Sequence, residues 1–340
     1  AVTGMHLLRR FGHTVDEIAA DGWTIDARVR MQAAGDGPTD QADGLARGVR
    51  GLARFFTAAE TDVVVVLGDR IEAMAGALAA VTTGRVLAHI HGGDIATGDI
   101  DEALRHAITK LAHLHFAATP VAARRVRRMG EPRGRIWCVG APGLDGVRDL
   151  LAAAPRPRRP TGLAIIAQHA YGRSPEVEQR VAANVLRAVS DAGLRRLIIY
   201  PNTDRGHSGV LAAIRAHART RGAEVVRSLP RDEYLRRLAT ADVLVGNSSS
   251  GIIEAPFVGT PSVDVGERQA GRELGGTSVV HAAESYAAVR RALDHALRLR
   301  PRRGGRTTYG DGRAGPRIAA LLARVRLTPD VRRKQLDLPD

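Results

Sequence analysis

The chain has 340 residues, of which 44% are hydrophobic, so it is long and apolar enough to form one large domain or two ordinary ones with packed cores. Its net charge of +14 favours an anionic ligand, but the arginines are spread along the chain and aromatic residues make up only 4% of it, which argues against a nucleic-acid surface. No apolar run is long enough for a membrane span, which argues against a membrane partner, and a single cysteine excludes an internal disulfide.

The first part of the chain alternates between strand and helix patterns. Residues 1–7 predict the end of a strand and its loop, and apolar residues at helical spacing predict a helix over 42–57. Further strands are expected at 63–67, 85–90, 115–119 and 136–139, with helices after the first two and over 120–129. Cys138 lies in the last of these strands, where we expect a small buried side chain in a protein of a reducing, cytoplasmic compartment.

A linker rich in proline and arginine follows at 152–162, and a second alternating run begins after it. Its strands are predicted at 163–168, 196–200, 224–226, 243–245 and 262–265, and its helices at 175–192, 210–221, 232–240, from 252 and at 285–299. We therefore predict an α/β protein with domains over 1–155 and 156–310, a C-terminal helix over 311–326 and a flexible polar tail over 327–340.

Three acidic side chains of the first domain follow predicted strands or begin a helix. Asp69 follows the strand at 63–67, Asp94 follows the strand at 85–90, and Asp101 lies in the first turn of the next helix. Ligands of parallel sheets bind where strands end, so we expect these acids to converge on one crevice. Carboxylates that perturb one another can divide into a base and an acid.

The words GDRIE, HIHGG, IDEALRHAITKLAHLHF and VGAPGLD strongly resemble the hydrolysing UDP-N-acetylglucosamine 2-epimerases, over about residues 1–320. The resemblance implies the GT-B architecture, in which two doubly wound, Rossmann-like domains face a cleft. It also implies elimination of UDP to a glycal, followed by addition of water with inversion at C2, which gives N-acetylmannosamine for sialic acids. It implies a homo-oligomer and no cofactor. A metal on His89, His91 and Asp94 is not expected, because the spacing suits one face of a strand.

The resemblance assigns roles to several first-domain residues. The three acids would be catalytic, although which of them is the base stays open. Arg70 and Arg105 would orient the acids or touch the substrate, or simply form ion pairs with them. His6 would face the crevice or lie on a solvated loop.

The second domain would hold the nucleotide. In GNSSSGIIE, a small-residue loop opens a predicted helix, and free backbone N–H groups at such a terminus bind phosphate. The resemblance places His169 on the pyrophosphate and Arg268 and Arg272 at the cleft edge, unless these arginines form an exposed salt-bridged loop. The remaining predicted nucleotide contacts are Asn202, Ser248, Ser249, Gly251 and Glu254.

The chain departs from the family pattern in two places. Asp94 stands where the family has glutamate, which shortens the reach of that carboxylate. The family also has a strand and a helix ahead of the TGMHL motif, which here lies at 3–7, so we expect an interrupted first sheet and poor solubility or activity. Two rival interpretations stay open, namely a GT-B glycosyltransferase with an acceptor and a nucleotide-sugar-binding protein without turnover. The choice between UDP and GDP, and the amino sugar itself, also stay open.

Overall fold

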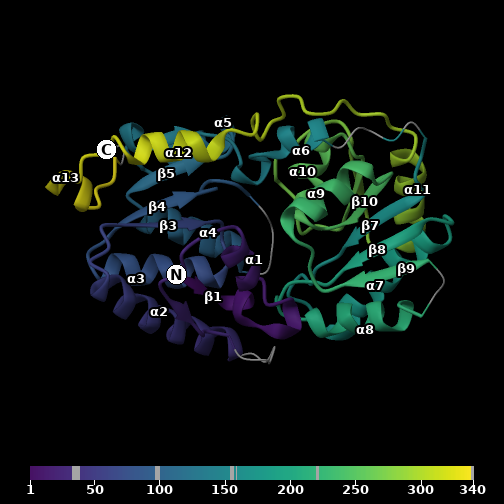
Figure 1. Ribbon diagram of the computed structural model, residues 1–340, viewed down its shortest axis with the longest axis horizontal. Coiled ribbons are helices and arrows are strands. Elements are labelled where there is room, and N and C mark those ends of the chain that lie inside the picture. The colour runs from purple at the N-terminus through teal and green to yellow at the C-terminus, as the bar shows by residue number, and fades with distance from the viewer. Residues whose placement is uncertain (33–38, 96–99, 154–156, 158, 220–221, 338–340) are drawn as a thin grey trace.

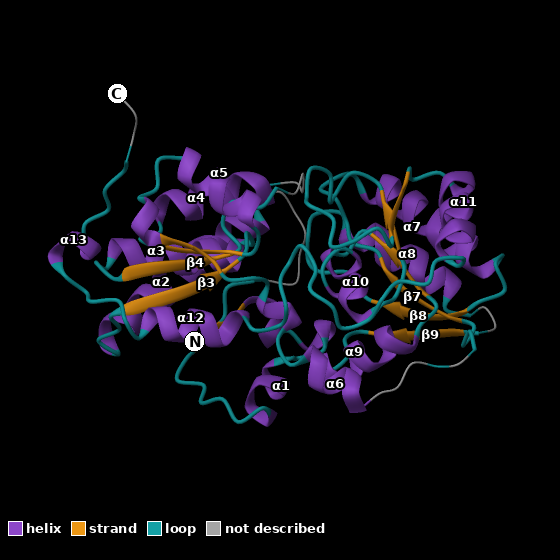
Figure 2. Ribbon diagram, turned by 90° about the horizontal axis from the view of Figure 1, so that it is seen from above, coloured by secondary structure: helices purple, strands orange, loops and turns teal. Residues whose placement is uncertain are grey.

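The computed structural model describes residues 1–340 except 33–38, 96–99, 154–156, 158, 220–221 and 338–340. Its strands form parallel sheets in two α/β units that lie beside each other (Figures 1 and 2). The predicted α/β class is confirmed. Parts of the predicted linker at 152–162, of the loop before Asp101 and of the tail lie outside the described residues.

The second unit has one continuous six-stranded sheet in the order β12-β11-β10-β7-β8-β9. Its strands bury side chains on both faces, as parallel sheets covered by helices do. In β10, Val243 and Val245 pack on one face and Leu244 packs on the other. The strands are β7 (Leu163–Ala167), β8 (Arg195–Ile199), β9 (Ala223–Val226), β10 (Val243–Gly246), β11 (Ser262–Val265) and β12 (Val279–Ala282).

Helices cover both faces of this sheet. Helices α7 (Pro175–Ser190), α8 (His207–His217) and α11 (Tyr286–Ala296) form one core with it, and α6 (Val147–Ala153), α9 (Arg231–Thr240) and α10 (Glu254–Val258) form the other. Leu144 and Val147 already belong to this second core, although they precede the predicted boundary at residue 155. The bounds of the two domains stay a prediction.

The first unit has a four-stranded sheet in the order β3-β4-β5-β6. These strands are β3 (Val63–Leu67), β4 (Val86–Ile90), β5 (Leu114–Ala117) and β6 (Ile136–Cys138). The helices of this unit are α1 (Val15–Ala20), α2 (Asp40–Ala58), α3 (Ile71–Thr82), α4 (Asp101–Leu111) and α5 (Pro120–Arg128). The core on one face of the sheet includes side chains of α2, α3 and α4, and α12 (Ala314–Leu322) returns from the second unit to cover part of the other face.

The first sheet is interrupted. β1 (Val2–Thr3) pairs only with β2 (Arg28–Val29) among the described residues, and β3 pairs only with β4. A cavity of about 920 Å³ runs from between β1 and β3 to the second unit. Val65 and Leu67 line it and keep 46% and 57% of their surface exposed, which is unusual for apolar residues of a parallel strand.

The end of the chain lies on the first unit. Helix α13 (Pro329–Arg332) contributes Arg332, which forms an ion pair with Asp62 at 2.9 Å. Lys334 forms an ion pair with the buried Glu131, which also binds Lys110 and His115 at 2.9 Å each. The sequence contains no lysines other than these two. The tail predicted to be flexible therefore makes specific contacts over the part of it that the structure describes.

Most predicted elements are present within a few residues of their expected bounds. Strands β2 and β12 and helices α1, α6 and α13 were not predicted. The expectation for Cys138 is wrong, because β6 is an edge strand that leaves this thiol exposed. No helix within the described ranges combines the length and the apolar composition needed to cross a bilayer.

Candidate active site between the two domains

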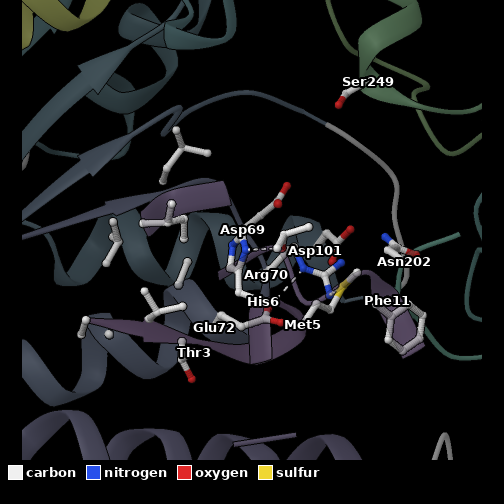
Figure 3. Close-up of a pocket in the computed structure, with 18 of the residues that line it drawn as sticks. Thr3, Met5, His6, Phe11, Asp69, Arg70, Glu72, Asp101, Asn202 and Ser249 are labelled. Atoms are coloured by element: carbon white, nitrogen blue, oxygen red, sulfur yellow. Dashed lines mark hydrogen bonds and ion pairs between the residues drawn. The ribbon is translucent and has the colours of Figure 1, made fainter. Parts of the chain in front are cut away.

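The acids of the first domain follow the carboxyl ends of β3 and β4 and begin α4, on the side that faces the second domain. Asp69 and Asp101 line the cavity (Figure 3). Asp94 is 3% exposed and lies behind it, in a tight turn. The turn needs unusual backbone: His91 has a φ of +65°, and a Cβ on Gly93 would lie 2.4 Å from the Ala122 carbonyl oxygen. A non-glycine residue in this region is strained and is held by its surroundings.

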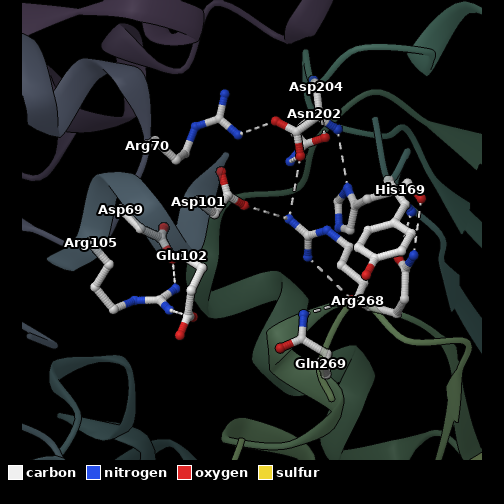
Figure 4. A network of polar contacts seen from close by, with 12 residues as sticks. Asp69, Arg70, Asp101, Glu102, Arg105, His169, Asn202, Asp204, Arg268 and Gln269 are labelled. Atoms are coloured by element: carbon white, nitrogen blue, oxygen red, sulfur yellow. Dashed lines mark hydrogen bonds and ion pairs between the residues drawn. The ribbon is translucent and has the colours of Figure 1, made fainter. Parts of the chain in front are cut away.

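Asp69 forms an ion pair with Arg105, whose side chain is 1% exposed. Arg105 also binds Glu102 at 3.2 Å and donates to the Asp94 carbonyl oxygen at 3.3 Å. Burial, and after it the charge of Arg272, lowers the pKa of Arg105 to about 9, so the guanidinium stays charged at neutral pH. One buried cation thus holds the ends of β3 and β4 and the start of α4 together (Figure 4).

Asp94 accepts a hydrogen bond from His91 Nδ1 at 3.0 Å and lies 3.7 Å from Arg272 of the second domain. Burial would raise its pKa, but the hydrogen bond from His91 and the charge of Arg272 lower it. Asp94 is therefore ionised at neutral pH. Its shorter side chain still reaches a cation on the opposite side of the cleft.

Asp101 lies 3.9 Å from Arg268 of the second domain. Arg268 donates to the Asn247 carbonyl oxygen at 3.3 Å, and Gln269 donates to the same oxygen at 2.9 Å. Arg268 and Arg272 are thus held in an interdomain network, and neither forms an exposed salt bridge. Together they give the second domain's side of the cleft a positive charge that suits a pyrophosphate.

His169 lies just after β7, in contact with the loop after β10. The Asn247 side chain accepts from the His169 backbone N–H at 2.7 Å and donates to its carbonyl at 3.0 Å. Gly246 permits this approach, because its φ is +138° and a Cβ would lie 2.2 Å from the Ala167 carbonyl oxygen. The imidazole Nδ1 accepts from the Asn202 backbone N–H at 3.1 Å, and burial lowers the pKa of His169 to about 3. The ring is neutral, so Nε2 carries the proton and can donate it in a hydrogen bond.

The predicted phosphate loop is a short 3₁₀ turn, Ser249–Gly251, two residues ahead of α10. Ser248 and Ser249 line the cavity, whereas Gly251 is buried and its N–H donates to the Ser248 carbonyl at 3.0 Å. Gly251 therefore shapes the turn, and its amide is already used within it. Glu254 lies behind the loop, and burial raises its pKa.

Arg70 forms an ion pair with neighbouring Glu72 at 3.2 Å. It reaches into the second domain, where Nη1 donates to Asp204 Oδ1 at 2.9 Å and Nη2 donates to Thr203 Oγ1 at 3.2 Å. His6 lines the first-domain part of the cavity, and its Nδ1 lies 2.7 Å from Thr14 Oγ1. Asn202 donates to Asp204 Oδ2 at 2.6 Å.

Sequence reasoning missed Asp204, Asn247 and Glu102. Asn247 stands in the GNSSSG loop and Glu102 in the word IDEALRHAITKLAHLHF, and Asp204 follows the predicted contact Asn202 by two residues. Nothing local in the sequence shows which partners these side chains bind. Among the residues that the structure describes, no group of three or more histidine, cysteine, aspartate or glutamate side chains could hold a metal ion. His89, for example, uses its ring nitrogens on Thr109 and the Gly68 carbonyl.

Comparison with known proteins places these residues in a family. A family model described as UDP-N-acetylglucosamine 2-epimerase matches residues 1–323. A Legionella pneumophila protein named UDP-N,N'-diacetylbacillosamine 2-epimerase (hydrolyzing) is 33% identical, over 98% of this chain and 89% of its own length. A UDP-N-acetylglucosamine 2-epimerase of Neisseria meningitidis serogroup B is 31% identical, over 82% of this chain and 74% of its own length.

Solved structures share the fold. The UDP complex of MnaA from S. aureus superposes with a TM-score of 0.74 at 16% identity, covering 94% of this chain and 88% of that one. The Methanocaldococcus jannaschii UDP-GlcNAc 2-epimerase in complex with UDP-GlcNAc and UDP gives 0.73 at 14% identity, covering 93% and 97%. The predicted GT-B architecture is confirmed.

Proposed function

Because the chain belongs to the UDP-N-acetylglucosamine 2-epimerase family, we propose that it is a hydrolysing member, which releases UDP and a free sugar inverted at C2. The observation that carries the proposal is the division of the cleft. Asp101 and Asp94 of the first domain face Arg268 and Arg272 of the second, which also supplies the neutral imidazole donor His169. Beside them, the ion pair between Arg70 and Asp204 joins the domains with the opposite polarity. Such a division suits a reaction in which one side removes a proton and the other accepts a departing diphosphate.

In the first step, a carboxylate takes the C2 proton while the C1–O bond breaks. The bonding electrons of C2–H form the C1=C2 double bond of a glycal, and UDP leaves with the electrons of C1–O. His169 Nε2–H, Arg268 and Arg272 would stabilise the charge that develops on the diphosphate. In the second step, water adds its hydroxyl to C1, and a proton returns to the opposite face of C2.

Asp69, Asp94 and Asp101 would share the proton transfers. Asp69 and Asp101 line the cavity and are the candidates for direct contact with the sugar. Asp94 is ionised and more deeply buried, behind the residues that line the cavity, so it would influence the proton transfers without direct contact with the sugar. Ser248, Ser249, Glu254 and Asn202 would hold the nucleotide. Names of relatives suggest two substrates, UDP-N-acetylglucosamine and UDP-N,N'-diacetylbacillosamine.

Proton NMR of turnover in D2O tests this function with each candidate substrate. We expect UDP, a free sugar with inverted C2, and deuterium at C2 of that sugar. A product that keeps its C2 hydrogen would exclude proton abstraction, and a product still attached to UDP would exclude the hydrolysing subtype. Release of the sugar without an added acceptor would exclude a glycosyltransferase, whereas UDP binding without any product would favour a binding protein.

A further inference from the structure

Asp204 is the central residue of the contacts that cross the cleft (Figure 4). Its Oδ1 accepts from Arg70 of the first domain at 2.9 Å. Its Oδ2 accepts from Asn202 at 2.6 Å and from Arg268 at 3.4 Å, both within the second domain. Its side chain is 18% exposed. One carboxylate therefore connects a cation of each domain, and Arg268 in turn lies beside Asp101.

The loop that carries Asp204 is well fixed. The His207 backbone N–H donates to the Asp204 carbonyl at 3.0 Å at the start of α8, and the carboxylate is held from its own domain by Asn202. Neighbouring Thr203 accepts from Arg70 and, at 3.4 Å, from Gln32 of the first domain. The loop at 202–204 is thus a preformed acceptor for first-domain donors.

Arg70 is committed to this contact. Its Nη1 binds Asp204, its Nη2 binds Thr203, and its Nε binds Glu72 of its own helix at 3.2 Å. Burial opposes the charge of Asp204, but Arg70 and Arg268 hold its pKa below the usual range, so the pair is ionic at neutral pH. The two Nη groups of Arg70 thus donate to two acceptors of the same loop, one of them charged, and this fixes the orientation of the guanidinium.

We propose that Asp204 is a positioning residue that latches the two domains together around the nucleotide sugar, through Arg70 on one side and Arg268 on the other. Closure brings Arg268 and Arg272 to Asp101 and Asp94, so the latch sets the charge environment of the acids. The latch itself rests on the geometry above, and only its catalytic consequence rests on the proposed function.

The latch is tested by energy transfer between dyes on the two domains. Ala46 on α2 and Ala216 on α8 are exposed, and Figure 1 shows these helices along the same edge of the molecule, one in each domain. Both are replaced by cysteine in a Cys138→Ser background for labelling. Without ligand, Asp204→Asn should lower the transfer efficiency, and saturating UDP should restore it. Asp232→Asn removes an exposed carboxylate from an ion pair within the second domain and should change nothing.

Binding measurements give an independent readout. UDP should bind Asp204→Asn more weakly than wild type, by roughly 5- to 150-fold, the usual range for coupling between a ligand and a conformational change. Asp204→Glu should recover part of the loss. Arg70→Gln combined with Asp204→Asn should weaken binding little beyond the single variants, because they remove the same contact. If Asp204→Asn folds poorly, Arg70→Gln alone tests the same contact from the other domain.

Two results would overturn the latch. Unchanged energy transfer in Asp204→Asn would show that the carboxylate does not hold the domains. Tighter UDP binding would show that the carboxylate competes with phosphate for Arg70 and Arg268. Neither readout needs turnover, so the latch can stand if the proposed reaction fails. In an active enzyme, the variant should raise KM and lower kcat/KM while deuterium incorporation at C2 persists.

Discussion

The two domains have the same kind of fold, but the sheet of the second domain is continuous and the sheet of the first is interrupted. The second domain has six consecutive parallel strands with helices on both faces, and its nucleotide-side residues lie where β7 and β10 end together. The first domain has four strands, a gap and then two short ones, and its acids follow the strands nearest the gap. The acids of the first domain are therefore positioned by Arg105 and by contacts from the second domain as much as by the first sheet.

The largest expected effect separates the roles of the two domains. Asp101→Asn should reduce kcat by about 10²–10⁴-fold, the usual cost of losing an acid–base group, while UDP binding persists. Calorimetric titration with UDP and NMR of sugar release measure the two quantities. Turnover close to that of wild type would remove Asp101 from the mechanism and leave Asp69 and Asp94.

Acid should destabilise the first domain more than the second. Burial lowers the pKa of His89 to about 3 and lowers the pKa values of His113 and His115. At a pH between the lowered pKa of a folded-state histidine and about 6.5, the imidazole binds a proton only in the unfolded chain. The free energy of unfolding therefore falls as the pH falls. His89 alone should cost about 2 kcal/mol at pH 5.

In the second domain, the pKa of His169 is also lowered, but burial raises the pKa of Asp264 to about 6. Asp264 binds a proton first in the folded state, and this offsets the histidine. Urea unfolding at pH 7 and pH 5 tests the difference, with fluorescence of Trp137 in β6 for the first domain and circular dichroism for the whole chain. Equal shifts of both transitions would contradict it.

A smaller effect is expected at the nucleotide loop. Ser249→Ala should raise KM about tenfold with little change in kcat, because it removes a hydrogen bond made equally in ground and transition states. Ser285→Ala removes a serine cap of α11 in the same domain, outside the lining of the cleft, and serves as the control. A large fall in kcat at constant KM would move Ser249 into the catalytic group.

The smallest effect tests the gap itself. Val65→Ala in β3 should change the free energy of unfolding by less than about 0.5 kcal/mol, because that side chain is already 46% exposed. The fully buried Val245 in β10 should cost about 1.5–3 kcal/mol when replaced by alanine. Chemical denaturation of both variants gives the comparison. A large cost at Val65 would show that the gap is filled in solution.

The sequence predicts what depends on local pattern and misses what depends on contacts between distant segments. Apolar runs identify β3, β4 and β10 nearly to the residue. β4 and β10 bury both faces of the strand, whereas one face of β3 leaves Val65 and Leu67 exposed. Strand β12 was missed because it is short and contains the exposed His281. The positions of the acids could be predicted from the strand ends. The direction of the Arg70 side chain, which points to the second domain, could not be predicted, because its partner Asp204 lies 134 positions away in the sequence.

The two connections between the domains have a mechanical consequence. The chain leaves the first sheet after β6, near Gly140, and returns toward it before α12, near Gly310. Each glycine has a positive φ, +93° and +107°. A Cβ on Gly140 would lie 3.1 Å from the Tyr309 carbonyl oxygen, and Ala141 N–H donates to that oxygen at 2.8 Å. Two connecting segments that are hydrogen-bonded to each other at one point would favour rotation of the domains about a single axis. Figure 1 shows α6 and α12, which follow these two connections, along one edge of the molecule and α8, which follows Asp204, along the opposite edge. A small rotation at these two glycines would therefore produce a larger displacement at the Arg70 contact, which lies far from them.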